Sequence, residues 1–208
     1  MADIFELFKK ISTSFPASTE PVSYIIAGLG NPGDEYTYTR HNAGFLCMDY
    51  IAQKNNCQVN RVKFKAMTAD VVVGGKRVLL LKPQTYMNKS GEAVSEAATF
   101  YKIPPENIIV LCDDVNFDAG KLRIRKKGSD GGQKGVRSII ERLGNDSFPR
   151  IKLGVGKKPT PEYDMGDWVL SRFSKEEEKK LYSAIESAYD ALLLMLSDKT
   201  DQAMAKYN

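Results

Sequence analysis

The chain has 208 residues, a hydrophobic fraction of 42% and a formal net charge of +4 at pH 7. This length supports one sizeable core, so we expect a single folded domain. Its apolar runs are far shorter than the roughly 20 residues of a membrane span, and its first 22 residues lack the features of a secretory signal. We therefore expect a soluble, cytoplasmic protein that does not act at a membrane.

Cysteine and histidine content narrows the kind of site that the chain can build. The three cysteines form no C-x-x-C pair, and His41 is the single histidine. This spacing lacks the paired ligands typical of a structural zinc tetrad. We expect a reduced protein that binds no metal.

Hydrophobic periodicity predicts the elements of the first half of the chain. Residues 1–22 are expected to form an extension or linker that precedes a domain over residues 23–208. A buried strand over 24–27 is followed by a helix over 43–54, for which Asn42 is a candidate N-cap. Strands over 68–73 and 76–81 flank Gly74-Gly75, which is typical of a hairpin.

The second half continues the alternation of helices and strands. Its predicted helices are 90–101, 136–143 and 175–197, the last of them capped by Ser174, and its predicted strands are 108–112, 121–127 and 150–155. Pro104-Pro105 ends the first of these helices. The fold class that we predict is α/β, a single-domain mixed β-sheet with helices packed on its faces.

A glycine pattern after the first strand raises a question of function. Gly28-x-Gly30-x-x-Gly33 has the spacing of a dinucleotide-binding loop, which requires a helix to start at the third glycine. The segment "DEYTYTR" that follows has no apolar face, and Asp49, where a ribose-binding acid would be sought, falls inside the predicted helix 43–54. A dinucleotide-dependent oxidoreductase is therefore the least favoured hypothesis.

Basic residues are concentrated between Lys121 and Arg137, a segment with seven basic residues and one acid. Strand alternation places Lys121, Arg123 and Arg125 on one face, with Leu122 and Ile124 facing the core. Such a row can contact phosphates without reading a base sequence. For any single residue, an ordinary solvated strand face is an equally good interpretation.

Four segments share their order and spacing with one known family. They are "GLGNPG" with "EY" and "TRHNAG" (28–44), "KPQTYMNKSG" (82–91), "CDDVNFDAGKLRIR" (112–125) and "GSDGGQKGVRSI" (128–139). Together they resemble the bacterial-type peptidyl-tRNA hydrolase family. The resemblance implies a monomeric esterase without cofactor that cuts the bond between a peptide's C-terminal carbonyl and the tRNA 3' ribose. Its partner would be peptidyl-tRNA, bound through the acceptor stem and the CCA end.

The resemblance also implies roles for particular residues. His41 would activate water as a general base, and Asp113 would orient the imidazole as the acid of a triad does. Asp114 is the second choice if the register is off by one. Asn31 would be the third catalytic residue, with an amide that hydrogen-bonds the ester carbonyl or the attacking water.

Two further groups of residues would bind the substrate. Contacts with the sugar, terminal base or peptide would come from Tyr36, Met87, Asn88 and Lys134. Asn88 has an alternative interpretation as the cap of the helix near Ser90. On the tRNA side, Arg125 and Lys152 would clamp a 5' phosphate, with Lys121 and Arg123 beside them.

The glycine loop departs from the family's usual pattern. Members usually carry Gly-Gly-His-Asn-Gly in the glycine loop, whereas this chain has Gly131-Gly132-Gln133-Lys134-Gly135. Lys134 cannot accept a hydrogen bond, so an amide contact to the peptide part is lost or replaced. A non-hydrolytic RNA-binding relative is therefore the alternative, although it would require neither His41 nor Asp113.

Overall fold

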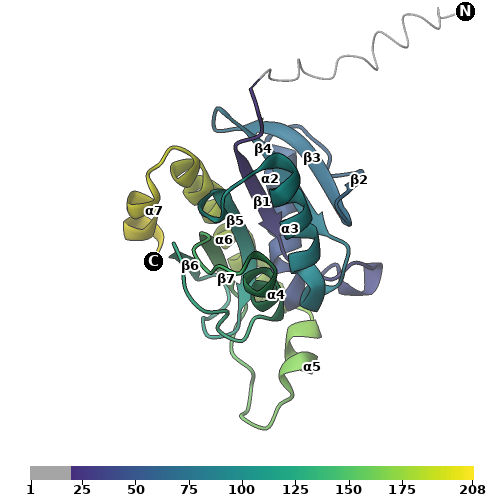
Figure 1. Cartoon of the computed structure of the whole chain (residues 1–208). Coiled ribbons are helices and arrows are strands. Elements are labelled where there is room, and N and C mark those ends of the chain that lie inside the picture. Colours follow the sequence, from purple (N-terminus) through teal and green to yellow (C-terminus); the bar gives the residue numbers. More distant parts are fainter. Residues whose placement is uncertain (1–19) are drawn as a thin grey trace, which may run out of the picture.

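The computed structural model describes residues 20–208, so the extension predicted for residues 1–22 lies, up to residue 19, outside the described residues. Within them, seven strands form one sheet in the order β2-β3-β4-β1-β5-β7-β6 (Figure 1). The strands are β1 (Tyr24–Gly28), β2 (Arg61–Lys63), β3 (Ala66–Val73), β4 (Lys76–Pro83), β5 (Ile108–Asp114), β6 (Leu122–Arg125) and β7 (Arg150–Gly154).

Strand directions divide the sheet into a parallel centre and antiparallel edges. β4, β1, β5 and β7 run parallel to one another. β3 and β2 continue the sheet antiparallel on one side, and β6 pairs antiparallel with β7 on the other. The carboxyl ends of the four parallel strands therefore meet at one edge, where ligands bind in open α/β sheets.

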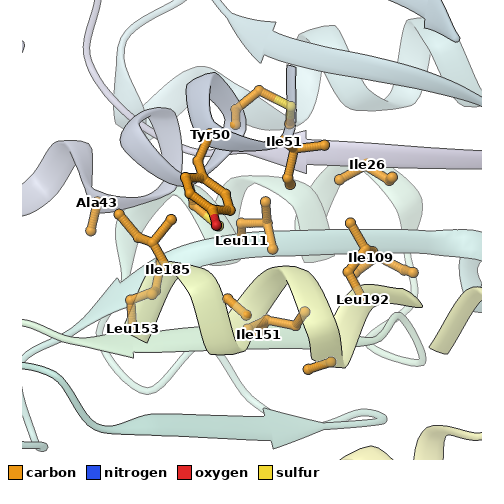
Figure 2. Close-up of a cluster of buried hydrophobic side chains, with 14 of the residues drawn as sticks. Ile26, Ala43, Tyr50, Ile51, Ile109, Leu111, Ile151, Leu153, Ile185 and Leu192 are labelled. Carbon is orange, nitrogen blue, oxygen red and sulfur yellow. The ribbon is translucent and has the colours of Figure 1, made fainter. Parts of the chain in front are cut away.

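Helices cover both faces of this sheet. On one face lie α2 (Ala43–Lys54), α6 (Lys175–Leu196) and α7 (Thr200–Tyr207), and on the other lie α3 (Ser90–Tyr101) and α4 (Lys134–Leu143). Ile26 and Ile109 pack toward the α2 and α6 side with Ile51 and Leu192 (Figure 2). The short helix α5 (Met165–Leu170) projects from the body (Figure 1).

The long helix α6 shows how local sequence sets an element. The Ser174 hydroxyl accepts a hydrogen bond from the Glu177 amide, and the Glu177 carboxylate accepts one from the Ser174 amide, which completes a capping box. Such a cap stabilises a helix by about 1 kcal/mol. The predicted cap is confirmed, and the buried stripe of α6 includes Leu181, Ile185 and Leu192.

Most predicted elements are confirmed, and the two helices 43–54 and 90–101 have the predicted bounds. The other predicted elements were wrong by one or two residues at one or both ends. For example, β5 continues to Asp114, β6 covers only Leu122–Arg125, and α4 begins at Lys134. β2, α5 and α7 were not predicted, because they have three, six and eight residues and offer too little periodicity.

Candidate active site

The loop that holds His41 is brought against the end of β5 by one glycine. His41 lies in a 3-10 turn, Arg40–Asn42, directly before α2. A Cβ added at Gly44 would lie 2.4 Å from the Leu111 carbonyl oxygen and 2.5 Å from that of Leu29. Only glycine allows α2 to start this close to the ends of β1 and β5.

His41 and Asp113 form a buried pair across these two elements. The His41 Nδ1 atom lies 2.9 Å from Asp113 Oδ2, and the residues are 9% and 2% exposed. An ionised carboxylate can only accept, so Nδ1 carries the proton of the neutral ring and Nε2 keeps its lone pair. Nε2 makes no hydrogen bond to any residue from 20 to 208, so it is available to a water molecule.

A cavity of about 290 Å³ opens beside this pair. Its walls come from the end of β5, the glycine loop before α4, β7 and α5. The lining residues are His41, Asp113, Asp114, Val115, Asn116, Gly131, Gly132, Gln133, Lys134, Lys152, Met165, Gly166 and Val169. The cavity can hold a small polar group next to the imidazole. Its two lysines, Lys134 and Lys152, can contact negative charge on a substrate.

The amide of Asn31 has a defined orientation. The Met87 backbone amide donates to Asn31 Oδ1 at 2.8 Å, so the Asn31 NH2 group faces away from this bond and makes no hydrogen bond within residues 20–208. Tyr86, before Met87, has a φ of 56°, a strained value for a residue with a side chain. Asn31 is therefore left as a donor, whereas the sequence suggested a donor and an acceptor.

Asn42 supports Asn31 and does not cap α2 as predicted. Its side-chain Oδ1 accepts from the backbone N–H of Asn31 at 2.8 Å, and its Nδ2 donates to the backbone carbonyl of Asn31 at 3.0 Å. No hydrogen bond from its side chain reaches the first turn of α2. The local capping preference is overridden because the same side chain satisfies two backbone groups of another loop.

The register question between the two acids is resolved by the geometry. Asp114 points to the other face of β5, where its carboxylate contacts Lys152 Nζ at 2.5 Å and accepts from Asn116. Asp113 alone is paired with His41, and its second oxygen, Oδ1, accepts from Gln133 Nε2 at 2.9 Å. The sequence had assigned no role to Gln133.

Arg40 anchors the His41 loop from beneath. Its buried guanidinium donates to both carboxylate oxygens of Glu177, at 2.8 and 2.9 Å, and to the Val155 carbonyl. It also stacks 3.8 Å from the centre of the Trp168 ring. The Arg40 hydrogen bonds lower the pKa of Glu177 to about 2, so this anchor is ionised at neutral pH.

Cys112, next to Asp113, is not a competing nucleophile. It is fully buried, and burial raises the pKa of its thiol to about 12. A thiol with this pKa carries essentially no thiolate at neutral pH. The imidazole of His41 is thus the group at this site suited to activating a nucleophile.

Comparison with known proteins decides the family. The peptidyl-tRNA hydrolase family model matches residues 25–208. The chain belongs to the peptidyl-tRNA hydrolase family. It is 52% identical over 187 residues to the peptidyl-tRNA hydrolase of Caldicellulosiruptor bescii, covering 90% of this chain and 97% of that protein.

Other relatives and a solved structure agree. The Agathobacter rectalis peptidyl-tRNA hydrolase is 50% identical over 186 residues, covering 89% of this chain and 100% of that one. The crystal structure of peptidyl-tRNA hydrolase from Acinetobacter baumannii matches with a TM-score of 0.85 and 34% identity, covering 89% of this chain and 94% of that chain. The predicted single-domain mixed sheet is confirmed by this similarity.

The dinucleotide interpretation fails, as the sequence had indicated. Gly33 is followed by a single 3-10 turn, Asp34–Tyr36, and not by a helix that could receive a pyrophosphate. Asp49 lies on α2 and pairs with Lys82 Nζ at 2.6 Å. The glycines of this loop instead lie within the residues that the peptidyl-tRNA hydrolase family model matches.

The basic row on β6 has the predicted alternation. Leu122 and Ile124 are buried, whereas Arg123 lies opposite Lys152 and Arg125 opposite Arg150 in the pairing with β7. These four basic residues share one face of the sheet. Arg123, Arg125 and Arg150 have no carboxylate partner within residues 20–208, while Lys121 pairs with Asp118 and Lys152 with Asp114.

The predicted substrate-binding residues divide into two groups. Lys134 is exposed, opens α4 and lines the cavity. Tyr36, Met87 and Asn88 are not among the residues that line it. Met87 is buried behind it, and Asn88 is exposed in the 3-10 turn Met87–Lys89 without capping α3. The capping interpretation of Asn88 is therefore wrong.

Residues 20–208 contain neither a cluster of metal ligands nor a membrane-spanning helix. No three His, Cys, Asp or Glu side chains gather as ligands for a metal ion in this part of the chain. Over the same residues, no helix has the length and apolarity needed to cross a membrane.

Proposed function

We propose that this chain hydrolyses the ester bond between the C-terminus of a peptide and the 3' ribose of tRNA in peptidyl-tRNA. The observation that carries the proposal is the 2.9 Å contact between His41 Nδ1 and Asp113 Oδ2 beside a cavity. It leaves one nitrogen of the only histidine free to act as a base. Membership of the peptidyl-tRNA hydrolase family supports the substrate and the reaction.

The proposed reaction uses His41 twice. His41 Nε2 takes a proton from water while the water oxygen bonds to the ester carbonyl carbon. The tetrahedral intermediate then breaks its bond to the ribose oxygen, which receives the proton from the imidazolium. The products are the peptide carboxylic acid and tRNA with a free 3' hydroxyl. Asp113 stabilises the imidazolium and keeps the proton of the neutral ring on Nδ1.

The Asn31 NH2 group is the proposed donor to the substrate carbonyl or to the oxyanion that develops from it. Its orientation is set by Met87, so little reorganisation is needed when charge develops. Lys134 would contact the peptide part from the rim of the cavity. Tyr36 and Asn88 would contact the sugar or terminal base.

The tRNA acceptor stem would lie along β6 and β7. Lys121, Arg123, Arg125 and Lys152 would contact its phosphates, with Arg125 and Lys152 at the 5' phosphate. Lys152 also lines the cavity, so the phosphate-binding face is continuous with the chemical site that receives the CCA end. Because one chain supplies every residue of this site, we propose that it acts as a monomer. Its proposed substrate, peptidyl-tRNA, places its action in the cytoplasm.

The test is release of an N-blocked aminoacyl group from tRNA by the wild-type protein and by His41→Ala, with no metal or cofactor added. We expect wild-type turnover and a loss of about 10²- to 10⁴-fold in the variant, the usual contribution of a general base. Full activity of a folded His41→Ala protein would remove the proposed base. A folded wild type that binds tRNA without turnover would favour the RNA-binding alternative.

A further inference from the structure

Gln133 makes three contacts with one amide group. It directly precedes α4 and is 8% exposed. Its Oε1 accepts from the Val136 amide at 2.8 Å, and its Nε2 donates to Asp113 Oδ1 at 2.9 Å. The same Nε2 lies 3.1 Å from Met87 Sδ. One side chain therefore joins the start of α4, the end of β5 and the loop after β4.

The orientation of this amide is unambiguous. The Val136 N–H can only donate, so its partner must be the Gln133 oxygen, and the NH2 group must face Asp113. The Gln133 donor fixes Oδ1 of the Asp113 carboxylate, and Oδ2 of the same group accepts from His41 Nδ1. With both oxygens bound and the residue 2% exposed, the carboxylate has a single orientation.

The same contacts connect the other site residues. Met87 donates its backbone N–H to Asn31 Oδ1, and its sulfur packs on the Gln133 amide. A Cβ at Gly135 would lie 2.6 Å from Met87 Sδ, so the start of α4 packs tightly against Met87. A change at Gln133 is therefore transmitted to Asp113 on one side and to Met87 on the other.

We propose that Gln133 is a positioning residue for the hydrolysis, which holds the Asp113 carboxylate in the orientation that faces His41 and thereby keeps the His41 proton on Nδ1. This inference rests on the proposed function of His41 as the base. The family usually has histidine at this position; the amide of Gln133 donates at every pH, whereas an imidazole changes its charge near neutrality. In this chain the donor to Asp113 is thus independent of pH.

Two substitutions separate the contact with Asp113 from the helix cap. Gln133→Asn keeps a strong N-cap but is one methylene shorter, so it cannot cap α4 and also reach Asp113. Gln133→Glu keeps length and shape, and its carboxylate can still accept from Val136, but it places a second negative charge against Asp113. Gln133→His restores a donor. Gln53→Glu, exposed near the far end of α2, adds the same charge away from the site.

We expect Gln133→Asn to lower kcat by about 10- to 100-fold with KM within about twofold of wild type, a usual cost of losing an orienting partner. Gln133→Glu should lose as much activity and shift the acidic limb of the kcat/KM profile to higher pH, because added negative charge favours the imidazolium. The other charged groups around the cavity, Asp114, Lys134 and Lys152, are unchanged in these variants. Gln133→His should recover most of kcat near neutral pH, and Gln53→Glu should match wild type.

The single histidine permits a readout that needs no substrate. The ¹H and ¹⁵N resonances of His41 should report a protonated Nδ1 in the wild type, loss of that preference in Gln133→Asn, and a titration midpoint at higher pH in Gln133→Glu. Unchanged kcat, pH profile and His41 resonances in folded Gln133→Asn and Gln133→Glu would overturn the inference. So would equal losses in Gln133→Asn and Gln133→His, which would indicate a merely structural role. An inactive wild type whose His41 resonances respond as expected would instead count against the proposed function.

Discussion

The His41 site and the basic face of β6 and β7 lie on the same sheet but are built in opposite ways. At the site, His41, Asp113 and Gln133 are buried, and His41 and Gln133 are both hydrogen-bonded to Asp113. On the basic face, Arg123 and Arg125 have no carboxylate partner within residues 20–208, and Arg125 is exposed. Lys152 belongs to both regions, because it lines the cavity and lies directly opposite Arg123 in the register of β6 and β7.

This difference matches the work that each region is proposed to do. Proton transfer requires one fixed geometry, so the structure satisfies the site with hydrogen bonds before substrate arrives. Binding to a phosphate backbone requires positive charge but no particular base sequence. Substitutions in the site should therefore change kcat, and substitutions on the basic face should change KM and the salt dependence of binding.

The largest effect on this comparison is expected from Asp113→Asn. Gln133 donates to Oδ1, so the new amide would turn its NH2 toward His41 Nδ1 and impose the wrong tautomer. We expect kcat to fall about 10²- to 10⁴-fold while tRNA affinity stays within about twofold. Steady-state kinetics and tRNA binding measure this, with the exposed Asp190→Asn on α6 as control. A variant with wild-type kcat would show that the pair has no catalytic role.

A smaller effect is expected from Arg125→Ala. Loss of one surface phosphate contact of about 1 kcal/mol should raise KM for peptidyl-tRNA about fivefold, leave kcat unchanged and reduce the salt slope of binding by about 1. Lys179→Ala, an exposed residue of α6, removes the same charge away from the face. If the two variants have equal KM values and salt slopes, β6 does not contact the tRNA.

The smallest effect on activity is expected from Glu177→Gln, which changes the ion pair that holds Arg40 and does not contact the substrate. The buried Arg40 guanidinium would lose its charged partner, at a cost of about 1–2 kcal/mol. Thermal unfolding at pH 7 should show a Tm lower by about 3 to 6 °C.

This difference in stability should depend on pH in a defined direction. The folded-state pKa of Glu177, about 2, lies below its ordinary value of 4.5. Its stabilisation is therefore complete above pH 4.5 and is lost as the pH falls toward 2. Urea unfolding of both proteins between pH 7 and pH 3 measures this trend. A constant difference across that range would show that the charge of Glu177 does not stabilise Arg40.

Apolar periodicity and proline positions were enough to predict the helices next to the site. The helices 43–54 and 90–101 have clear apolar periodicity, and Pro104-Pro105 limits the second, so their ends were predicted correctly. α5 contributes Met165 and Val169 to the cavity but has only six residues, which is too short for a periodic pattern.

Long-range contacts explain what the sequence could not supply. Asn42 looked like a cap because its partner, Asn31, is 11 residues earlier and on another element. Gln133 looked like a loop residue because its contact, Asp113, is 20 residues away in the chain. The choice between Asp113 and Asp114 depended on which face of β5 meets the His41 loop, and only the assembled sheet determines that.

One measurement tests the division between chemistry and binding most directly. Single-turnover cleavage of N-blocked aminoacyl-tRNA and the Kd for the same tRNA would be measured across a salt series for wild type, His41→Ala and Arg125→Ala. We predict that His41→Ala loses cleavage at every salt concentration with an unchanged Kd, and that Arg125→Ala cleaves bound substrate at the wild-type rate with a weaker, less salt-dependent Kd. Cleavage by His41→Ala at the wild-type rate would contradict the account.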